Sequence, residues 1–386
     1  MIFASGGPDT VSSEYQIRST GAAPVLVTAG GTGGHLFPAE ALATALAERG
    51  IAVHLATDHR AARFGGAFAE DAIHVVASAT LRARNPIALT RTAAALGVGF
   101  LQAWTLIGRL KPAAVIGFGG YPTIPPVMAA SWRGVPTVIH DANAVIGRAN
   151  RLLAPRVTAI ATTFPDVFGS EPVLALKATL TGNPVRAAVV AAAAIPYPGA
   201  HDPFRLLVFG GSQGARVMAD IVPAAIGRLD TGLRRRLAVV QQAREEDMDR
   251  VRRAYAKAAV AAEIAPFFTD LPARMAASHL VIARSGASTV AELSAIGRPS
   301  ILVPLPHALD QDQFANAGML ERTGGACRMV QDSFTPERLA AELERLAASP
   351  QRLAAMAAAA RSLGRLDAAG QLADLVLRVA GIANKR

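Results

Sequence analysis

Two histidines and an aspartate stand where extended runs of the chain give way to turns. His35 ends the glycine-rich segment GGTGGH, which follows the β-branched run PVLVTAG. An imidazole with a near-neutral pKa can remove a proton from a hydroxyl group. His140 and Asp141 close another apolar run, PTVIHD, and Asn143 follows. We therefore predict proton transfer at His35, with Asp141 as a second candidate base. Asp141 could equally cap a helix that starts near Ala144.

A second set of polar residues lies in the segment ARSGASTVAEL, residues 283–293. Its serines, glycine and threonine offer hydroxyl and backbone N–H groups to a diphosphate, and Glu292 could accept both hydroxyls of a ribose. A capping turn with a solvated glutamate is the alternative. The loop VPLPHALDQDQFANA then gathers amides and carboxylates that suit sugar hydroxyls, namely Asp310, Gln311, Asp312, Gln313 and Asn316.

The elements that must position these residues form a rough internal duplication. In each half a β-branched run ends in a glycine loop and a helical stretch follows, over residues 24–50 and again over residues 204–229. Further extended runs alternate with helical stretches, at IAVHLAT, AAVIGFG, PTVIHD and VTAIAT, then at RLAVVQQ, HLVIAR and PSILVPL. This alternation predicts an α/β fold with two doubly wound parallel sheets, joined by a linker within residues 181–203. The active site is expected between them, at the carboxyl ends of the strands.

The two glycine loops could each hold a phosphate at the start of a helix. Neither is followed by GK[ST], and neither contains G-x-G-x-x-G in register. A tight strand-to-helix turn without a ligand would explain a single glycine cluster. Two clusters that open two matching halves favour phosphate binding.

Composition and charge narrow the class of protein. Of the 386 residues, 51% are hydrophobic and 18% charged, which predicts a globular chain with sizeable cores. The net charge is +10, and Asp141 is the only acid between Ala72 and Pro165, so an anionic partner is expected.

Nucleic acid and disulfide or zinc chemistry are disfavoured by the residue composition. Aromatic residues make up 5% of the chain and do not interleave with the basic ones, which argues against nucleic acid as the anionic partner. Cys327 is the only cysteine, which excludes an internal disulfide or a cysteine-based zinc site.

No segment has the pattern of a secretory signal or a strong membrane span. Residues 1–22 are expected to form a flexible tail, and the uncharged stretch from Thr92 to Gly108 contains three glycines and a glutamine. This helical stretch could lie on an anionic membrane surface instead, or its apolar residues could belong to the core, with the arginines as a solvated rim. Apolar residues near one face would contact lipid, namely Leu89, Leu96, Phe100, Leu101 and Trp104. Basic residues flank them, namely Arg82, Arg84, Arg91, Arg109 and Lys111.

Seven motifs in this order resemble the MurG family of glycosyltransferases: GGTGGHLFPA, GFGGYPTIPP, IHDANAVIGRANRLLA, TGNPVR, FGGSQGARV, ARSGASTVAEL and PHALDQDQFANA. The resemblance implies the GT-B fold, two Rossmann-like domains that face across a cleft. It also implies inverting transfer of N-acetylglucosamine (GlcNAc) from UDP-GlcNAc to the muramyl 4-hydroxyl of lipid I, which gives lipid II in peptidoglycan synthesis. The expected location is peripheral, on the cytoplasmic face of the cell inner membrane. No cofactor and no metal are implied.

The resemblance also assigns domains and site residues. The N-terminal acceptor domain would span residues 23–184 and the UDP-GlcNAc domain residues 185–364, with a C-terminal helix at about 365–386 packed back on the first. His35 is the favoured base, and Tyr121 and His140 would lie on the acceptor side. Implied donor contacts are Thr32, Gly33, Gly34, Asn143, Arg186, Ser212, Phe268, Ala287, Ser288, Thr289, Val290, Ala291, Glu292 and Gln313.

The chain departs from the family pattern at two positions within the matching motifs. Asp141 stands where the family often has glutamate, and Asp312 precedes Gln313 where a pair of glutamines is usual. The contact at Phe268 would be made by its backbone to uracil.

Two other functions stay open from the residues alone. A nicotinamide-dependent oxidoreductase would use the first glycine loop and Asp58, but the dinucleotide motif is missing. A binding module without catalysis would explain the basic bias, but not the polar residues at strand ends in both halves.

Overall fold

The structure, a computed structural model, describes residues 23–30, 33–59, 68–78, 86–169, 171–199, 203–211, 214–306, 308 and 311–383. The N-terminal tail expected at residues 1–22 lies outside the described residues. The strands are β1 (Val25–Thr28), β2 (Val53–Thr57), β3 (Ile73–Val75), β4 (Ala114–Gly117), β5 (Thr137–Asp141), β6 (Ala159–Thr162), β7 (Ala178–Leu180), β8 (Phe204–Phe209), β9 (Leu237–Gln242), β10 (Ala261–Ala265), β11 (Leu280–Ala283), β12 (Ser300–Leu302) and β13 (Ala326–Arg328).

The α-helices alternate with these strands along the chain. They are α1 (Gly33–Ala47), α2 (Pro86–Leu110), α3 (Ile124–Trp132), α4 (Arg148–Leu153), α5 (Pro172–Ala175), α6 (Ala187–Ala193), α7 (Arg216–Ile226), α8 (Thr231–Arg236), α9 (Glu245–Lys257), α10 (Leu271–Ala277), α11 (Ala287–Ile296), α12 (Asp312–Arg322), α13 (Pro336–Ala347), α14 (Pro350–Leu363) and α15 (Ala368–Val379).

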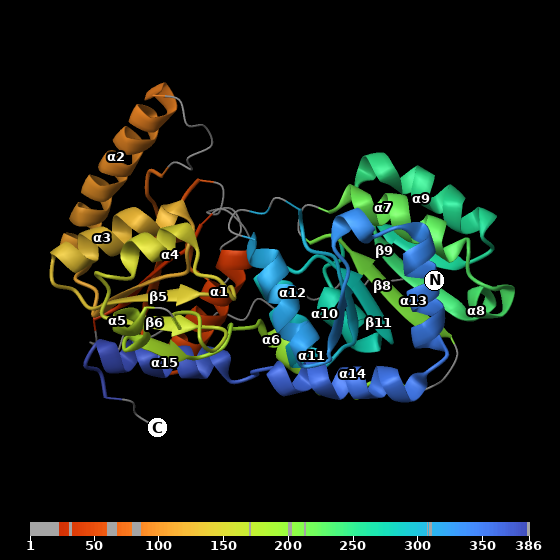
Figure 1. Ribbon diagram of the computed structural model, residues 1–386. Coiled ribbons are helices and arrows are strands. Elements are labelled where there is room, and N and C mark those ends of the chain that lie inside the picture. Colours follow the sequence, from red (N-terminus) through yellow and green to blue (C-terminus); the bar gives the residue numbers. More distant parts are fainter. Residues whose placement is uncertain are drawn as a thin grey trace, which may run out of the picture.

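Two parallel sheets form the centres of two halves (Figure 1). The sheet of the first half has the order β3-β2-β1-β4-β5-β6-β7, and the sheet of the second half has the order β10-β9-β8-β11-β12-β13. All the pairings in both sheets are parallel. The predicted fold of two doubly wound parallel sheets is confirmed.

Helices cover both faces of each sheet. In the first half, α1 and α15 pack on one face, and α2, α3 and α4 pack on the other. In the second half, α7, α9 and α13 cover one face, and α6, α10, α11 and α12 cover the other. Strands buried on both sides explain the near-continuous apolar runs of the inner strands, such as VLVT and LVIA.

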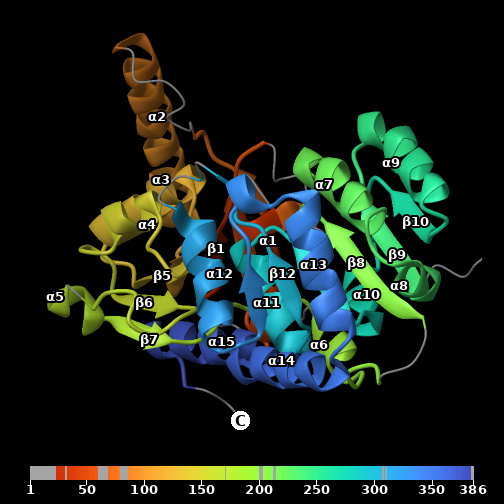
Figure 2. The same ribbon diagram turned by 45° about the vertical axis from the view of Figure 1, so that its right-hand side comes forward.

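The chain crosses between the halves twice. It passes from β7 to α6, and it returns between α14 and α15, so that α15 lies beneath the first sheet beside α1 (Figures 1 and 2). Leu372 and Val376 of α15 share a buried cluster with Leu36 and Leu42 of α1. The stretch expected to be a linker contains α6, whose Val189 is buried in the second half. An alanine-rich run that packs on one side makes a helix rather than a loose connection.

Candidate active site between the two halves

The first turns of α1 and α11 meet at the junction of the two halves. Ser288 Oγ of α11 lies 3.4 Å from the Gly34 carbonyl oxygen of α1, to which it donates a hydrogen bond. The first N–H groups of a helix have no partner within it, and the helix dipole adds positive potential there. An anion at the junction would therefore face two helix N-termini, one from each half.

His35 lies in the first turn of α1, at this junction. Its Nδ1 is 3.1 Å from the Gly30 carbonyl oxygen, so Nδ1 carries the proton and Nε2 presents a lone pair. A Cβ atom on Gly119 would lie 3.4 Å from His35 Nε2, and Gly119 has a φ of +87° that disfavours side chains. Burial lowers the pKa of His35, which keeps the imidazole neutral near pH 7, while the nearby charge of Asp312 acts in the opposite direction.

Asp141 is buried, at 1% exposure, and organises the loop that follows β5. Its Oδ1 accepts a hydrogen bond from the Asn143 N–H at 3.1 Å, and its Oδ2 accepts from the Gly147 N–H at 2.9 Å and from Asn150 Nδ2 at 3.0 Å. Burial raises its pKa to about 6 despite these donors. A carboxylate committed to three donors is a poor candidate for removing a substrate proton, so the geometry favours His35 over Asp141 as base.

One prediction about this segment needs correction. The helix expected near Ala144 is α4, which begins at Arg148, because Asp141 folds the intervening residues into a turn. His140, expected on the acceptor side, is 0% exposed. Its Nε2 lies 3.1 Å from the Gly182 carbonyl oxygen, and burial lowers its pKa to about 4, which makes it a neutral part of the core. Tyr121 is half-buried beside the glycines that contact His35.

Arg186 and Glu292 form an ion pair where the second half meets α1. Arg186 Nη2 is 3.2 Å from Glu292 Oε1, and the guanidinium carbon lies 4.2 Å from the ring centroid of Phe37. Glu292 is 7% exposed, and burial raises its pKa while Arg186 lowers it. Sequence reasoning missed Phe37, although it follows His35 by two residues.

The loop predicted to hold a diphosphate is the start of α11. Gly286 precedes the helix with extended backbone, so the first three residues, Ala287 to Thr289, direct their N–H groups to the junction, while the Val290 N–H donates to the Gly286 carbonyl at 3.0 Å. Gly33 and Gly34 open α1 on the opposite side. Thr32 and Ser212, the other residues expected at the donor, lie outside the described residues.

Gln242, at the carboxyl end of β9, links two loops of the second half. Its Oε1 accepts from the Gly210 N–H at 3.0 Å, and its Nε2 donates to the Pro266 carbonyl at 3.1 Å. Phe268, expected to meet uracil through its backbone, follows Pro266 and is buried under the guanidinium of Arg274, at 4.4 Å. Gln242 was missed, although a polar residue at a strand end is the signal that drew attention to His140.

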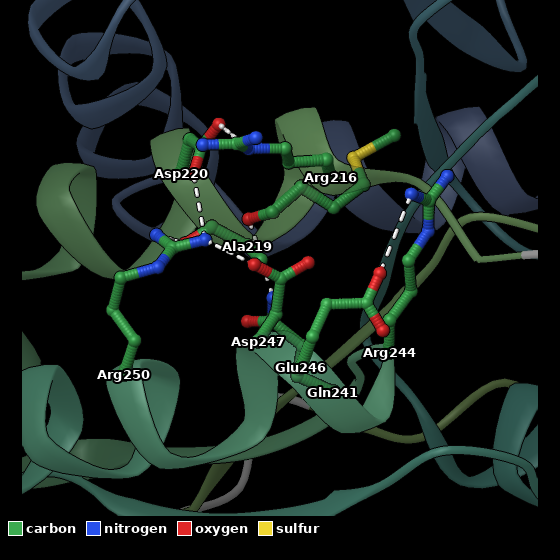
Figure 3. Close-up of polar contacts among 9 residues, drawn as sticks. Arg216, Ala219, Asp220, Gln241, Arg244, Glu246, Asp247 and Arg250 are labelled. Carbon is green, nitrogen blue, oxygen red and sulfur yellow. Dashed lines mark hydrogen bonds and ion pairs between the residues drawn. The ribbon is translucent and has the colours of Figure 1, made fainter.

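An arginine at the start of α9 borders the second glycine loop. A Cβ atom on Gly214 would lie 3.0 Å from Arg244 Cγ, and Arg244 Nη1 pairs with Glu246 at 3.7 Å (Figure 3). α9 is fixed to α7 by Arg250, which pairs with Asp220 at 2.7 Å. No local sequence pattern marks Arg244, because it lies 30 residues along the chain from Gly214, which it borders.

The polar loop before α12 splits into described and undescribed parts. His307, Leu309 and Asp310 lie outside the described residues. Gln313 Oε1 accepts from the Leu305 N–H at 3.0 Å. Asn143 Oδ1, from the first half, accepts from Asn316 Nδ2 at 2.9 Å. The two residues expected to touch a sugar, Asn143 and Gln313, thus come from opposite halves. Among the described residues no group of three or more histidine, cysteine or acidic side chains could hold a metal.

Comparison with known proteins shows matches along most of the chain. The glycosyltransferase family 28 N-terminal domain matches residues 25–162, and the glycosyltransferase family 28 C-terminal domain matches residues 205–372. The UDP-N-acetylglucosamine–N-acetylmuramyl-(pentapeptide) pyrophosphoryl-undecaprenol N-acetylglucosamine transferase of Rhodopseudomonas palustris strain BisB18 is 64% identical over 363 residues, 94% of this chain and 97% of that protein. The transferase of the same name from Bradyrhizobium diazoefficiens is 61% identical over 93% of this chain and 98% of that protein.

Solved structures agree with this likeness. The crystal structure of MurG from Acinetobacter baumannii matches with a TM-score of 0.75 and 28% identity, over 92% of this chain and 99% of that one. The MnaA–UDP structure from S. aureus matches with a TM-score of 0.67 and 14% identity, over 94% and 98% of the two chains. The second likeness concerns the fold alone.

Proposed function

The chain belongs to glycosyltransferase family 28, and we propose that it transfers GlcNAc from UDP-GlcNAc to lipid I, which forms lipid II for peptidoglycan synthesis. The observation that carries this proposal is the junction, where the N-termini of α1 and α11 meet beside a histidine from one half and a partly buried arginine–glutamate pair from the other. Transfer of a sugar from a donor bound by one half to an acceptor bound by the other requires groups from both halves at the same place.

UDP-GlcNAc would bind mainly to the second half. The first turn of α11, from Ala287 to Ala291, would hold the diphosphate, and Glu292 would accept the ribose hydroxyls. Uracil would meet the Phe268 backbone. Ser212 and Thr32 complete the proposed donor set, together with Gly33, Gly34, Asn143, Arg186 and Gln313. The Arg186 guanidinium lies 3.2 Å from Glu292, and its charge opposes the burial that raises the pKa of this carboxyl group.

His35 would act as the base from the first half. Its Nε2 would take the proton of the muramyl 4-hydroxyl as that oxygen attacks the anomeric carbon of GlcNAc. The new C–O bond forms as the bond to the UDP oxygen breaks on the opposite face, which inverts the anomeric centre. Negative charge that develops on the leaving diphosphate would be stabilised by the N–H groups of α11.

We place the domain limits at residues 23–184 and 185–364, with residues 365–386 joined to the first domain. This division rests on the two chain crossings and on α15, which packs against α1. The acceptor then belongs to the domain that carries His35 and α2, and the donor belongs to the other.

The acceptor carries a polyprenyl chain, so the enzyme must meet a membrane surface, and we propose that α2 and the end of α3 do so. The helical segment Thr90–Leu110 is long and apolar enough to span a membrane by composition, and 22% of its most apolar window is buried. It projects from the body of the first half (Figures 1 and 2). Leu101 is 66% exposed and Trp132 of α3 is 63% exposed.

The exposed apolar residues overlap only in part with those expected on sequence alone. Phe100 and Trp104 are half-buried against the core, and Phe100 lies 5.1 Å from the Trp132 ring. Leu101, which was expected, is exposed, and Val98 and Trp132 join it in the proposed lipid-facing set. Of the expected basic flank, Arg82 and Arg84 lie outside the described residues, as does the Leu89 side chain, while Arg91 and Arg109 are exposed. Attachment would be peripheral, on the cytoplasmic face of the inner membrane.

Sedimentation with vesicles tests this membrane face. We expect binding to phosphatidylglycerol vesicles and not to phosphatidylcholine vesicles, and we expect Arg91→Glu with Arg109→Glu to weaken binding at least about tenfold, because each basic group near anionic lipid contributes about 1 kcal/mol. Arg235→Glu with Arg352→Glu makes the same charge change on the second half and should bind normally. Equal loss from both pairs would move the membrane face elsewhere.

A transfer assay tests the function. The purified chain, UDP-GlcNAc labelled in the sugar, and a lipid I analogue with a shortened prenyl chain should give one labelled disaccharide product per UDP released. UDP-glucose and NAD serve as controls for sugar specificity and for the oxidoreductase alternative. Release of UDP without a labelled product, or a response to NAD alone, would contradict the proposal.

A further inference from the structure

Asn316 is a buried amide that bonds to both halves of the molecule. It lies in the second turn of α12 and is 0% exposed. Its Oδ1 accepts from the Ala144 N–H at 2.8 Å, and its Nδ2 donates to Asn143 Oδ1 at 2.9 Å. Its Nδ2 also lies 3.3 Å from the Ser285 carbonyl oxygen. One side chain thus forms hydrogen bonds, as acceptor and as donor, with loops of both halves.

The partners of Asn316 belong to the two loops that the reaction must align. Asn143 and Ala144 follow β5 in the first half, in the turn that Asp141 organises. Ser285 lies between β11 and α11, two residues before the helix turn assigned to the diphosphate. Ser285 Oγ also donates to the Gln313 carbonyl at 2.8 Å, which fixes α12 to this loop.

The chemistry of these bonds suits a reversible contact. Amide hydrogen bonds are directional, so they specify one arrangement of the two loops. Water can replace them when the halves separate, so their net contribution is modest and the halves can part to exchange substrates. A buried ion pair at the same place would bind more rigidly and would cost more to desolvate.

We propose that Asn316 is a positioning residue that clasps the two halves together, so that the donor loop at Ser285 and the acceptor loop at Asn143 and Ala144 are held in register for transfer. This role rests on the proposed function for its effect on turnover. The clasp itself limits the distance between the two halves, and this distance can be measured without any reaction.

Spin labels report that distance directly. Leu176→Cys in the first half, where Leu176 is 89% exposed, and Arg352→Cys in the second half would carry nitroxides, in a chain with Cys327→Ser. Pulsed electron resonance would then compare wild type, Asn316→Ala and Asn143→Ala, each with and without UDP-GlcNAc. Ser278→Ala is the matched control, because it removes a buried hydrogen bond, from Ser278 Oγ to the Arg274 carbonyl, that stays within the second half.

We expect Asn316→Ala to broaden the distance distribution toward longer separations. Loss of its bonds to the first half should shift the closed-to-open ratio by about 5- to 150-fold. The kcat should fall by at least about tenfold, with a smaller change in donor affinity by calorimetry. In the distance distribution, Asn143→Ala should act in the same direction but less strongly, and the double variant should open no further than Asn316→Ala alone, because Asn316→Ala already removes the contact to Asn143.

An unchanged distance distribution in both variants would overturn the clasp, whatever happens to turnover. If Asn316→Ala fails to fold, the distance distribution of Asn143→Ala alone still tests the clasp. Asn143 is only half-buried, so this variant should fold. A wild-type chain that shows the clasp but transfers no GlcNAc would refute the proposed function and leave the clasp standing.

Discussion

Two buried carboxylates, one in each half, differ in how completely the protein itself satisfies them. Asp141 in the first half accepts three hydrogen bonds, from two backbone N–H groups and the Asn150 amide. Within the part of the chain that the structure describes, Glu292 in the second half has one side-chain partner, Arg186. The carboxylate with a full set of donors holds a loop in shape. The one with a single partner keeps acceptor capacity for hydroxyls that a ligand would bring.

Two histidines of the first half, His35 and His140, differ in exposure. His140 is fully buried, and its Nε2 lies against the Gly182 carbonyl, whereas His35 is half-buried at the junction, and its Nδ1 donates to the Gly30 carbonyl. A substrate at the junction could therefore meet His35 more readily than His140, which is why we propose His35 as the base.

The largest effect is expected at His35. His35→Ala should lower turnover by roughly 10²–10⁴-fold, because the attacking hydroxyl would lose its base, while calorimetry should show nearly unchanged UDP-GlcNAc affinity. Loss of donor binding would instead mark His35 as structural. Full turnover in this variant would remove the distinction drawn between His35 and Asp141.

Glu292 should show the reverse pattern. Charge-assisted hydrogen bonds contribute about 1.5–3 kcal/mol each, so Glu292→Ala should weaken UDP-GlcNAc binding by at least tenfold. Glu292→Gln keeps the shape and separates charge from packing. Circular dichroism should show both variants folded, and wild-type affinity in either calorimetric titration would refute the ribose contact.

Asp141 should matter for stability more than for donor binding. Asp141→Ala leaves the Gly147 and Asn143 N–H groups without this acceptor, while the Asn150 amide keeps the His140 carbonyl, and a buried donor without a partner costs about 1–3 kcal/mol of the free energy of unfolding. Urea denaturation would measure this loss. A stable Asp141→Ala variant with greatly reduced turnover would instead support a catalytic role.

The pH dependence of turnover should show a smaller effect. Burial lowers the pKa of His35, and the base form exists above that pKa, so kcat/KM should fall only on the acid side of His35's ordinary range. The charge of Asp312 raises the pKa of His35, so Asp312→Asn should move the acid limb of the profile to lower pH. A shift to higher pH would mean that another group controls this limb.

The sequence predicted the inner strands and missed the outer ones. The four strands absent from the prediction are β3, β7, β10 and β13, which are the edge strands of the two sheets. An edge strand is buried less completely, and segments such as IHV and AAEIA lack the continuous apolar run of a central strand.

For the site, too, the sequence predicted only what local patterns carry. Glycine loops and polar strand ends predicted that His35, Asp141 and Glu292 lie at or beyond the carboxyl ends of strands, and the structure has them there. Which of them are satisfied internally depends on partners distant in sequence. The Gly182 carbonyl that contacts His140 is 42 residues away, and the Asn316 amide that contacts Asn143 is 173 residues away. No local pattern reports such contacts.

A crystal structure with UDP-GlcNAc tests the comparison most directly. We expect the ribose hydroxyls within hydrogen-bond distance of Glu292 and the diphosphate at the first turn of α11. Asp141 should keep its hydrogen bonds to Asn143, Gly147 and Asn150 as in the free protein. A nucleotide bound to the first half, or a sugar hydroxyl bonded to Asp141 in place of its backbone donors, would contradict it.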